Sequence, residues 1–97
     1  MTADLATFLR TQFTEELKNA RFTSSMMVTQ AERLGIKPED AAKQGRFSLA
    51  TAEARLALFE DTVVPYLGAA GPGGRNAEYQ LRLLAAPYVE HKDYPHD

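Results

Sequence analysis

The chain contains no cysteine and no tryptophan among its 97 residues. The absence of cysteine excludes disulfide bonds, thiolate zinc sites and cysteine nucleophiles. No apolar run approaches the roughly 20 residues that a membrane-spanning helix requires, and no basic segment followed by an apolar one marks a signal peptide. From these absences we expect a cytoplasmic protein that does not enter membranes.

The chain also lacks an excess of charge of either sign. Its 11 Lys and Arg stand against 13 Asp and Glu, which gives a formal charge of -2 at pH 7. Proteins that bind nucleic acid through its phosphates carry basic patches, so this balance argues against a general nucleic-acid binder. Hydrophobic residues make up 44% of the composition. That proportion suffices for a packed core, and we expect residues 1–97 to form a single helical domain.

The longest apolar register lies in residues 48–67 and predicts a central α-helix. Its apolar side chains alternate steps of three and four, which places them along one stripe. The stripe comprises Leu49, Ala52, Leu56, Phe59, Val63 and Tyr66. Phe59 is midway along it and is expected at the centre of the core. A second row of small residues includes Ala50, Ala54 and Ala57. This row predicts that the helix is covered on two sides, with Phe8 and Phe13 packed against the alanines.

Before the central helix, the sequence predicts one long helix and two short ones. The long helix begins within residues 2–4 and ends at a break formed by the serines of residues 24–25. Short helices are expected over residues 26–34 and 38–45. Gly35 separates them, in the left-handed conformation that caps a helix C-terminus.

After the central helix, the sequence predicts a linker, a last helix and a tail. Pro65 is expected to bend or shorten the central helix because proline has no amide hydrogen to donate. Four glycines and a proline predict a flexible linker over residues 68–75. The last helix is expected to begin with Asn76 as its cap and to end at Pro87, before an irregular tail over residues 88–97. The predicted fold class is all-α, a small helical bundle of three main helices plus one or two short helices.

Two segments are candidates for contact with another protein. Met26 and Met27 are followed by Val28, and three adjacent residues of a helix cannot all face one core, so at least one is expected to be exposed. In the tail, Tyr88 and Tyr94 are expected to pack their rings on the end of the bundle. The candidate partner-binding residues are Met26, Met27, Tyr88, His91, Asp93 and Tyr94, where His91 and Asp93 serve as hydrogen-bonding anchors or as the rim of the partner site.

Two alternatives to a protein-interaction role stay open. The helix pair that turns at Gly35 has the spacing of a DNA-binding helix-turn-helix, with Lys43 and Arg46 as its nearby cations. The tail provides a second set of residues that are metal ligands in kind, namely His91, Asp93, His96 and Asp97. Pro95 prevents a helix that would align them, and His96 and Asp97 are expected to fray. A metal-dependent enzyme is therefore the third hypothesis.

The last helix and the tail resemble the C-terminal signature of a family of small uncharacterised proteins, a domain of unknown function, from high-GC Gram-positive bacteria and their phages. The resemblance there is carried by Leu81, Arg82, Leu83, Leu84, Ala85, Pro87, Tyr88, His91, Asp93 and Tyr94. Residues 4–10 and 52–55 are similar to two other blocks of that family. That family has a histidine-containing stretch just before the central helix, and residues 42–47, which stand in its place in this chain, contain no histidine. The tryptophans expected of the family are also absent.

The resemblance implies a small accessory protein, encoded by a bacterium or a phage, and no particular activity. Together with the composition, it leads us to expect a non-catalytic protein-interaction module that binds a host or self protein, with a homodimer among the alternatives. No catalytic residue, cofactor or bound metal is predicted.

Overall fold

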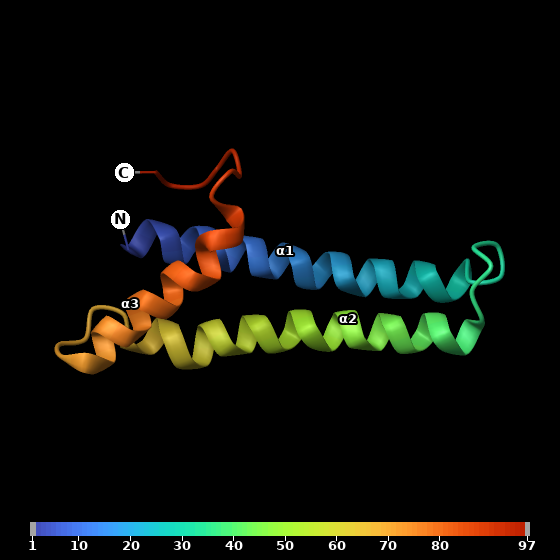
Figure 1. Ribbon diagram of the computed structural model, residues 1–97, viewed down its shortest axis with the longest axis horizontal. Coiled ribbons are helices and arrows are strands. Elements are labelled where there is room, and N and C mark those ends of the chain that lie inside the picture. The colour runs from blue at the N-terminus through green and yellow to red at the C-terminus, as the bar shows by residue number, and fades with distance from the viewer. Residues whose placement is uncertain (1, 97) are drawn as a thin grey trace. The chain divides into compact units, whose positions relative to one another are not determined.

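The computed structural model describes residues 2–96, and all the regular elements within them are helices. The three long helices are α1 (Thr2–Thr29), α2 (Pro38–Leu58) and α3 (Pro72–Ala85), as Figure 1 shows. The short elements are a π-helical turn, η1 (Phe59–Val63), and two 3-10 turns, η2 (Val64–Tyr66) and η3 (Ala86–Tyr88). The all-α class with three main helices is confirmed.

The described residues group into two compact units. Unit 1 combines residues 2–12 with residues 57–96, and unit 2 is the continuous stretch of residues 13–56. Helices α1 and α2 therefore contribute residues to both units. That residues 1–97 form a single helical domain stays a prediction.

Unit 2 is a helical hairpin, in which α1 and α2 lie side by side and run in opposite directions (Figure 1). Ser24 faces Gly45 in the half of the hairpin nearer its turn. Glu16 and Arg55 form an ion pair of 3.0 Å farther from the turn. From the first contact to the second, the residue number decreases on α1 and increases on α2, which is the pattern of two antiparallel helices.

The turn of the hairpin contains the left-handed Gly35 that the sequence predicts. Gly35 has a φ of 74°, a conformation that is favourable for glycine because it has no Cβ. Its N–H donates to the Glu32 carbonyl at 3.1 Å, and the Ile36 N–H donates to the Ala31 carbonyl at 2.9 Å. These two bonds together define the Schellman motif, which satisfies carbonyls that the end of a helix leaves without donors.

Two predicted breaks in this hairpin are wrong. Residues 24–25 lie inside α1, which continues to Thr29, so no separate helix covers residues 26–34. Residues 38–45 and the first part of the predicted central helix are one continuous helix, α2, which begins ten residues before the expected start at residue 48. The second error has a physical cause. Gly45 is buried where a side chain would collide with Ser24, so it permits close packing of the two helices and does not end one of them.

We expect Gly45→Ala to lower the free energy of unfolding by about 1 kcal/mol. Alanine is up to about 1 kcal/mol better than glycine within a helix, but overpacking costs about 1 to 3 kcal/mol. A Cβ at this position would overlap the Ser24 hydroxyl and lie 3.3 Å from the Ser24 Cα. Urea denaturation monitored by circular dichroism measures the difference.

A double-mutant cycle with Ser24→Gly controls that experiment. Removing the Ser24 side chain removes the obstacle, so Gly45→Ala in the Ser24→Gly background should be neutral or stabilising. Equal destabilisation in both backgrounds would show that the contact with Ser24 is not the cause.

The core of unit 1 forms where η1 packs against α3 and the start of α1. Its buried apolar side chains are Phe8, Leu9, Phe59, Val63, Ala77, Leu81 and Ala85. Phe59 has no exposed surface, so its predicted central place in the core is confirmed. Arg10 adds an ion pair at the edge of this core. Its Nε and Nη2 lie 2.5 and 3.2 Å from the two carboxylate oxygens of Glu60, and its guanidinium carbon lies 5.9 Å from the centre of the Phe59 ring.

The helix that follows Leu58 changes its winding before Pro65. The Val64 N–H donates to the Phe59 carbonyl, five residues back, and the Leu67 N–H donates to the Val64 carbonyl, three residues back. Proline lacks an N–H and its ring clashes with the carbonyl four residues earlier, so an α-helix cannot continue unchanged through this position. The predicted effect of Pro65 is confirmed, and α2 itself ends at Leu58.

Three further expectations about packing and boundaries are wrong. Helix α3 begins at Pro72 with Gly71 as its N-cap, so the predicted linker over residues 68–75 is shorter and Asn76 lies inside the helix. Ala50, Ala54 and Ala57 are all exposed, which means that this row of α2 is not covered. Phe8 and Phe13 therefore do not pack against these alanines. Phe8 packs against the tail. Phe13 lies beneath Arg55, whose guanidinium carbon is 5.8 Å from the centre of the Phe13 ring.

Candidate functional site

The tail packs onto the start of α1 through a cluster of aromatic rings. The ring of Phe8 contacts those of Tyr88, His91 and Tyr94, with centroids 6.1, 5.4 and 5.6 Å away and edge-to-face geometry in each case. Phe8 is buried, whereas the three tail rings are half-buried. The prediction that the tail docks back onto the helices is therefore confirmed, and most of the candidate ring surface is used in this packing.

Local hydrogen bonds shape this tail. The Asp93 N–H donates to Nδ1 of His91 at 3.0 Å. The His91 N–H donates to the Tyr88 carbonyl at 2.8 Å, and the Tyr94 N–H donates to the His91 carbonyl at 3.0 Å. His91 thus anchors the turns of the tail, and the Asp93 side chain is exposed.

The possible metal ligands of the tail are not assembled in the structure. Within residues 2–96, no three His, Asp or Glu side chains lie close enough together to hold a metal ion. The centre of the His96 ring lies 4.8 Å from that of the Tyr94 ring. The backbone N–H of His96 donates to the Tyr94 carbonyl at 3.0 Å. His96 is exposed, and its fraying stays a prediction. Asp97, the fourth possible ligand, lies outside the described residues.

Shortening the chain to end at Pro87 should lower its melting temperature by about 4 to 8 °C, since a loss of about 1 kcal/mol has that effect in a domain of this size. The truncation removes all three rings that cover Phe8. Differential scanning calorimetry measures the change. Asp93→Ala is the control, because it keeps the rings and the backbone N–H, and it should shift the melting temperature by less than a quarter as much. An unchanged melting temperature on truncation would contradict the packing role of the tail.

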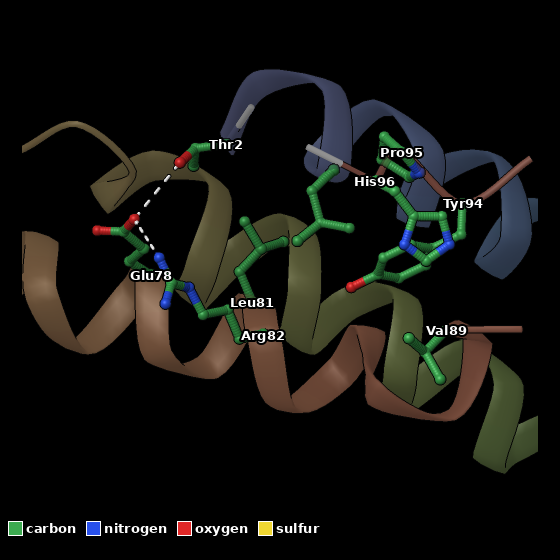
Figure 2. Close-up of a pocket in the computed structure, with 9 residues that line it drawn as sticks. Thr2, Glu78, Leu81, Arg82, Val89, Tyr94, Pro95 and His96 are labelled. Carbon is green, nitrogen blue, oxygen red and sulfur yellow. Dashed lines mark hydrogen bonds and ion pairs between the residues drawn. The ribbon is translucent and has the colours of Figure 1, made fainter.

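Unit 1 has a cavity of about 470 Å³ between the start of α1, α3 and the tail. Figure 2 shows Glu78 at one end, where it accepts hydrogen bonds from the Thr2 hydroxyl at 3.5 Å and from Arg82 at 3.2 Å. The rings of Tyr94 and His96 lie at the other end. The remaining wall includes Leu5, Leu81, Val89 and Pro95. The cavity therefore combines an apolar wall with one ion pair that is already formed.

A second hollow, which we call the hairpin groove, lies in unit 2 between α1 and α2. It measures about 270 Å³ and is lined by Glu16, Ala20, Phe47, Ser48, Thr51, Ala52 and Arg55. Four of these side chains are small, and the Glu16–Arg55 ion pair is part of the lining. Phe47 also lines the groove, although 74% of its surface is exposed.

The sequence alone does not predict the hairpin groove. Phe47 precedes the predicted central helix, and no role is predicted for it. The available signal is that Phe47 is a large aromatic residue outside the stripe that contains Ala52 and Phe59. Ala20 and Ala52 could be assigned to one groove only after the antiparallel pairing of α1 and α2 was known.

The methionine pair also lies in unit 2. Met26 is 37% exposed, Val28 is exposed and Met27 is intermediate. The prediction that at least one of these three residues is exposed is confirmed. Their role in binding a partner stays a prediction.

The same hairpin contains the segment considered as a DNA-binding motif. Helix-turn-helix units cross at about 90 to 120°, whereas α1 and α2 run side by side in unit 2 (Figure 1). Lys43 and Arg46 lie within the 21-residue helix α2 and not on a short recognition helix. The hairpin therefore has a different geometry from that motif.

The chain matches no family model, no curated protein and no solved structure in the comparisons. Within residues 2–96, no helix is both long enough and apolar enough to cross a bilayer.

Proposed function

We propose that this chain is a non-catalytic protein-interaction module, and that it binds a host or self protein through the surface of its helical hairpin. The observation that carries the proposal is Phe47, a large aromatic side chain that remains 74% exposed beside a groove of small residues. Aromatic residues beside hollows of this kind are typical anchors of protein interfaces.

The sparse core of unit 2 supports the same proposal. Of its 44 residues, only Phe13, Ala31, Ala41 and Gly45 are buried, and Phe13 is the one large side chain among them. Two helices alone can cover one stripe of each other, so their other faces are available to a partner. The tail rings are less suitable, because they already pack on Phe8.

The proposed setting is the cytoplasm of a high-GC Gram-positive bacterium, where the protein acts as an accessory encoded by the cell or by a phage. The resemblance of the last helix and tail to a family from those bacteria and phages supports this setting. The resemblance assigns no activity, which is consistent with a role in binding.

Site-specific photo-crosslinking tests the proposal. A photoreactive phenylalanine analogue placed at Phe47 of the full chain in bacterial cells should yield adducts with protein, identified by mass spectrometry. The same analogue at Tyr79, an aromatic residue of unit 1 that is 64% exposed, is the control and should yield few. Equal adducts at both positions, or none at Phe47, would contradict a binding surface on the hairpin.

A further inference from the structure

The hairpin groove and the exposed Phe47 ring lie on the same surface of unit 2. The groove of about 270 Å³ is lined by the small side chains of Ala20, Ser48, Thr51 and Ala52, and Phe47 lies at its edge. A surface that contains both an exposed ring and a hollow can pair with a second copy of itself. In a twofold dimer each contact occurs twice, because residue i of one chain meets residue j of the other and the reverse.

We infer that a second copy of this chain is the partner, and that in the resulting twofold dimer each Phe47 ring enters the hairpin groove of the other chain. This inference rests on the proposed function and names its partner. It requires no change in either helix, since the groove is open and the ring is exposed.

The charges of the groove lining allow a second copy to bind. The groove carries one carboxylate, Glu16, and one guanidinium, Arg55, held 3.0 Å apart. A groove with charges of one sign would repel its own copy, whereas a paired acid and base allow Glu16 of one chain to face Arg55 of the other. Such complementarity fixes the register of an interface and excludes partners with mismatched charges.

The size of the contact predicts a reversible dimer. Each aromatic ring contributes about 150 to 250 Å² of buried area, whereas a standard stable interface buries about 1,600 Å² in total. Two Phe47 rings therefore provide a minority of the area, and flanking parts of the hairpin surface must provide the rest. We expect dimerisation to depend on protein concentration.

Sedimentation equilibrium of the purified full chain is the first test. The apparent mass should rise with concentration from 10.7 kDa towards twice that value. Phe47→Glu should weaken the dimer by about 100-fold, because two identical contacts are lost and each 1.4 kcal/mol corresponds to tenfold in affinity. The matched control is Phe22→Glu, which changes a 68% exposed phenylalanine of the same unit that does not line the groove. Its affinity should stay within about twofold of the original chain.

A charge exchange tests the register. Glu16→Arg alone and Arg55→Glu alone should each dimerise weakly, because like charges then meet in the homodimer. An equimolar mixture of the two variants should form a heterodimer, in which both interchain pairs are again opposite in charge. Restoration of a pair within one chain cannot explain that result, since each variant keeps like charges within its own chain. Circular dichroism of every variant confirms that the helices are retained.

A constant mass of 10.7 kDa at all concentrations, equal effects of Phe47→Glu and Phe22→Glu, or the absence of a heterodimer would each overturn the inference. The proposed function is judged separately. Adducts from position 47 to a different protein, with a monomeric purified chain, would retain the interaction module and reject self-association.

Discussion

Replacing Phe59 with alanine should lower the free energy of unfolding by about 3 to 5 kcal/mol, the range for deleting a buried phenylalanine. A domain of this size has a total stability on the order of 5 to 15 kcal/mol, so the variant is expected to be partly unfolded at moderate temperature. Phe59 has no exposed surface and lies in η1, between α3 and the Arg10 guanidinium. Its removal would leave a cavity in the part of unit 1 where these elements meet.

Leu58→Ala is the matched control for that substitution. Leu58 is the neighbouring residue and is also apolar, but it is 51% exposed. Its replacement should change the stability by less than about 1 kcal/mol, because little surface is returned to water and no enclosed cavity forms. Urea denaturation of both variants gives the comparison. Similar losses for the two would mean that Phe59 is not the centre of the core.

Gly74→Ala should destabilise the protein by about 3 kcal/mol, while Gly73→Ala, one residue earlier, should stabilise it by about 0.4 to 1 kcal/mol. Both glycines lie at the start of α3. A Cβ at Gly74 would overlap the carbonyl oxygen of Ala69, a backbone atom that cannot rotate away, whereas a Cβ at Gly73 would meet nothing within 4 Å. Alanine at Gly73 therefore gains helix propensity and reduces the freedom of the unfolded chain without a steric penalty.

The melting temperatures of the two glycine variants should thus move in opposite directions. Both substitutions add the same methyl group to the same helix, so the difference between them isolates the close approach of residue 69. If both variants were stabilised, the loop of residues 67–71 would not pack against α3 as the structure has it.

The sequence predicts the parts of this fold that depend on neighbours along the chain. The spacing of Phe59 and Val63 predicts two residues of the buried core, Pro65 indicates where the winding of the helix changes, and Gly35 indicates the Schellman turn that follows α1. Each of these effects acts within about one turn of helix. Pro72 is also such a signal, since proline is favoured in the first turn, but the surrounding glycines predict a linker.

The errors concern contacts between segments that are distant in sequence. Gly45 has the composition signal of a helix end, and only the nearby Ser24 on the other helix shows that it is a packing position. The tail was expected to cover the bundle, but nothing local identified Phe8, 80 residues before Tyr88, as the centre of the ring cluster. The hairpin groove cannot be predicted from local sequence for the same reason, since Ala20 and Phe47 come together only when α1 and α2 pair.

The division of unit 1 into residues 2–12 and 57–96 has a consequence for the order of folding. Contacts within unit 1 close a loop of the intervening 44 residues, at an entropic cost on the order of 3 kcal/mol. Those residues form the hairpin, whose contacts begin at the local turn around Gly35 and can extend outward to the pair of Glu16 and Arg55. A hairpin that forms first holds its two ends together, because Arg55 lies over Phe13. The entropic cost of closing the loop is then divided among small local steps. The two segments of unit 1 start close together, so unit 1 assembles faster.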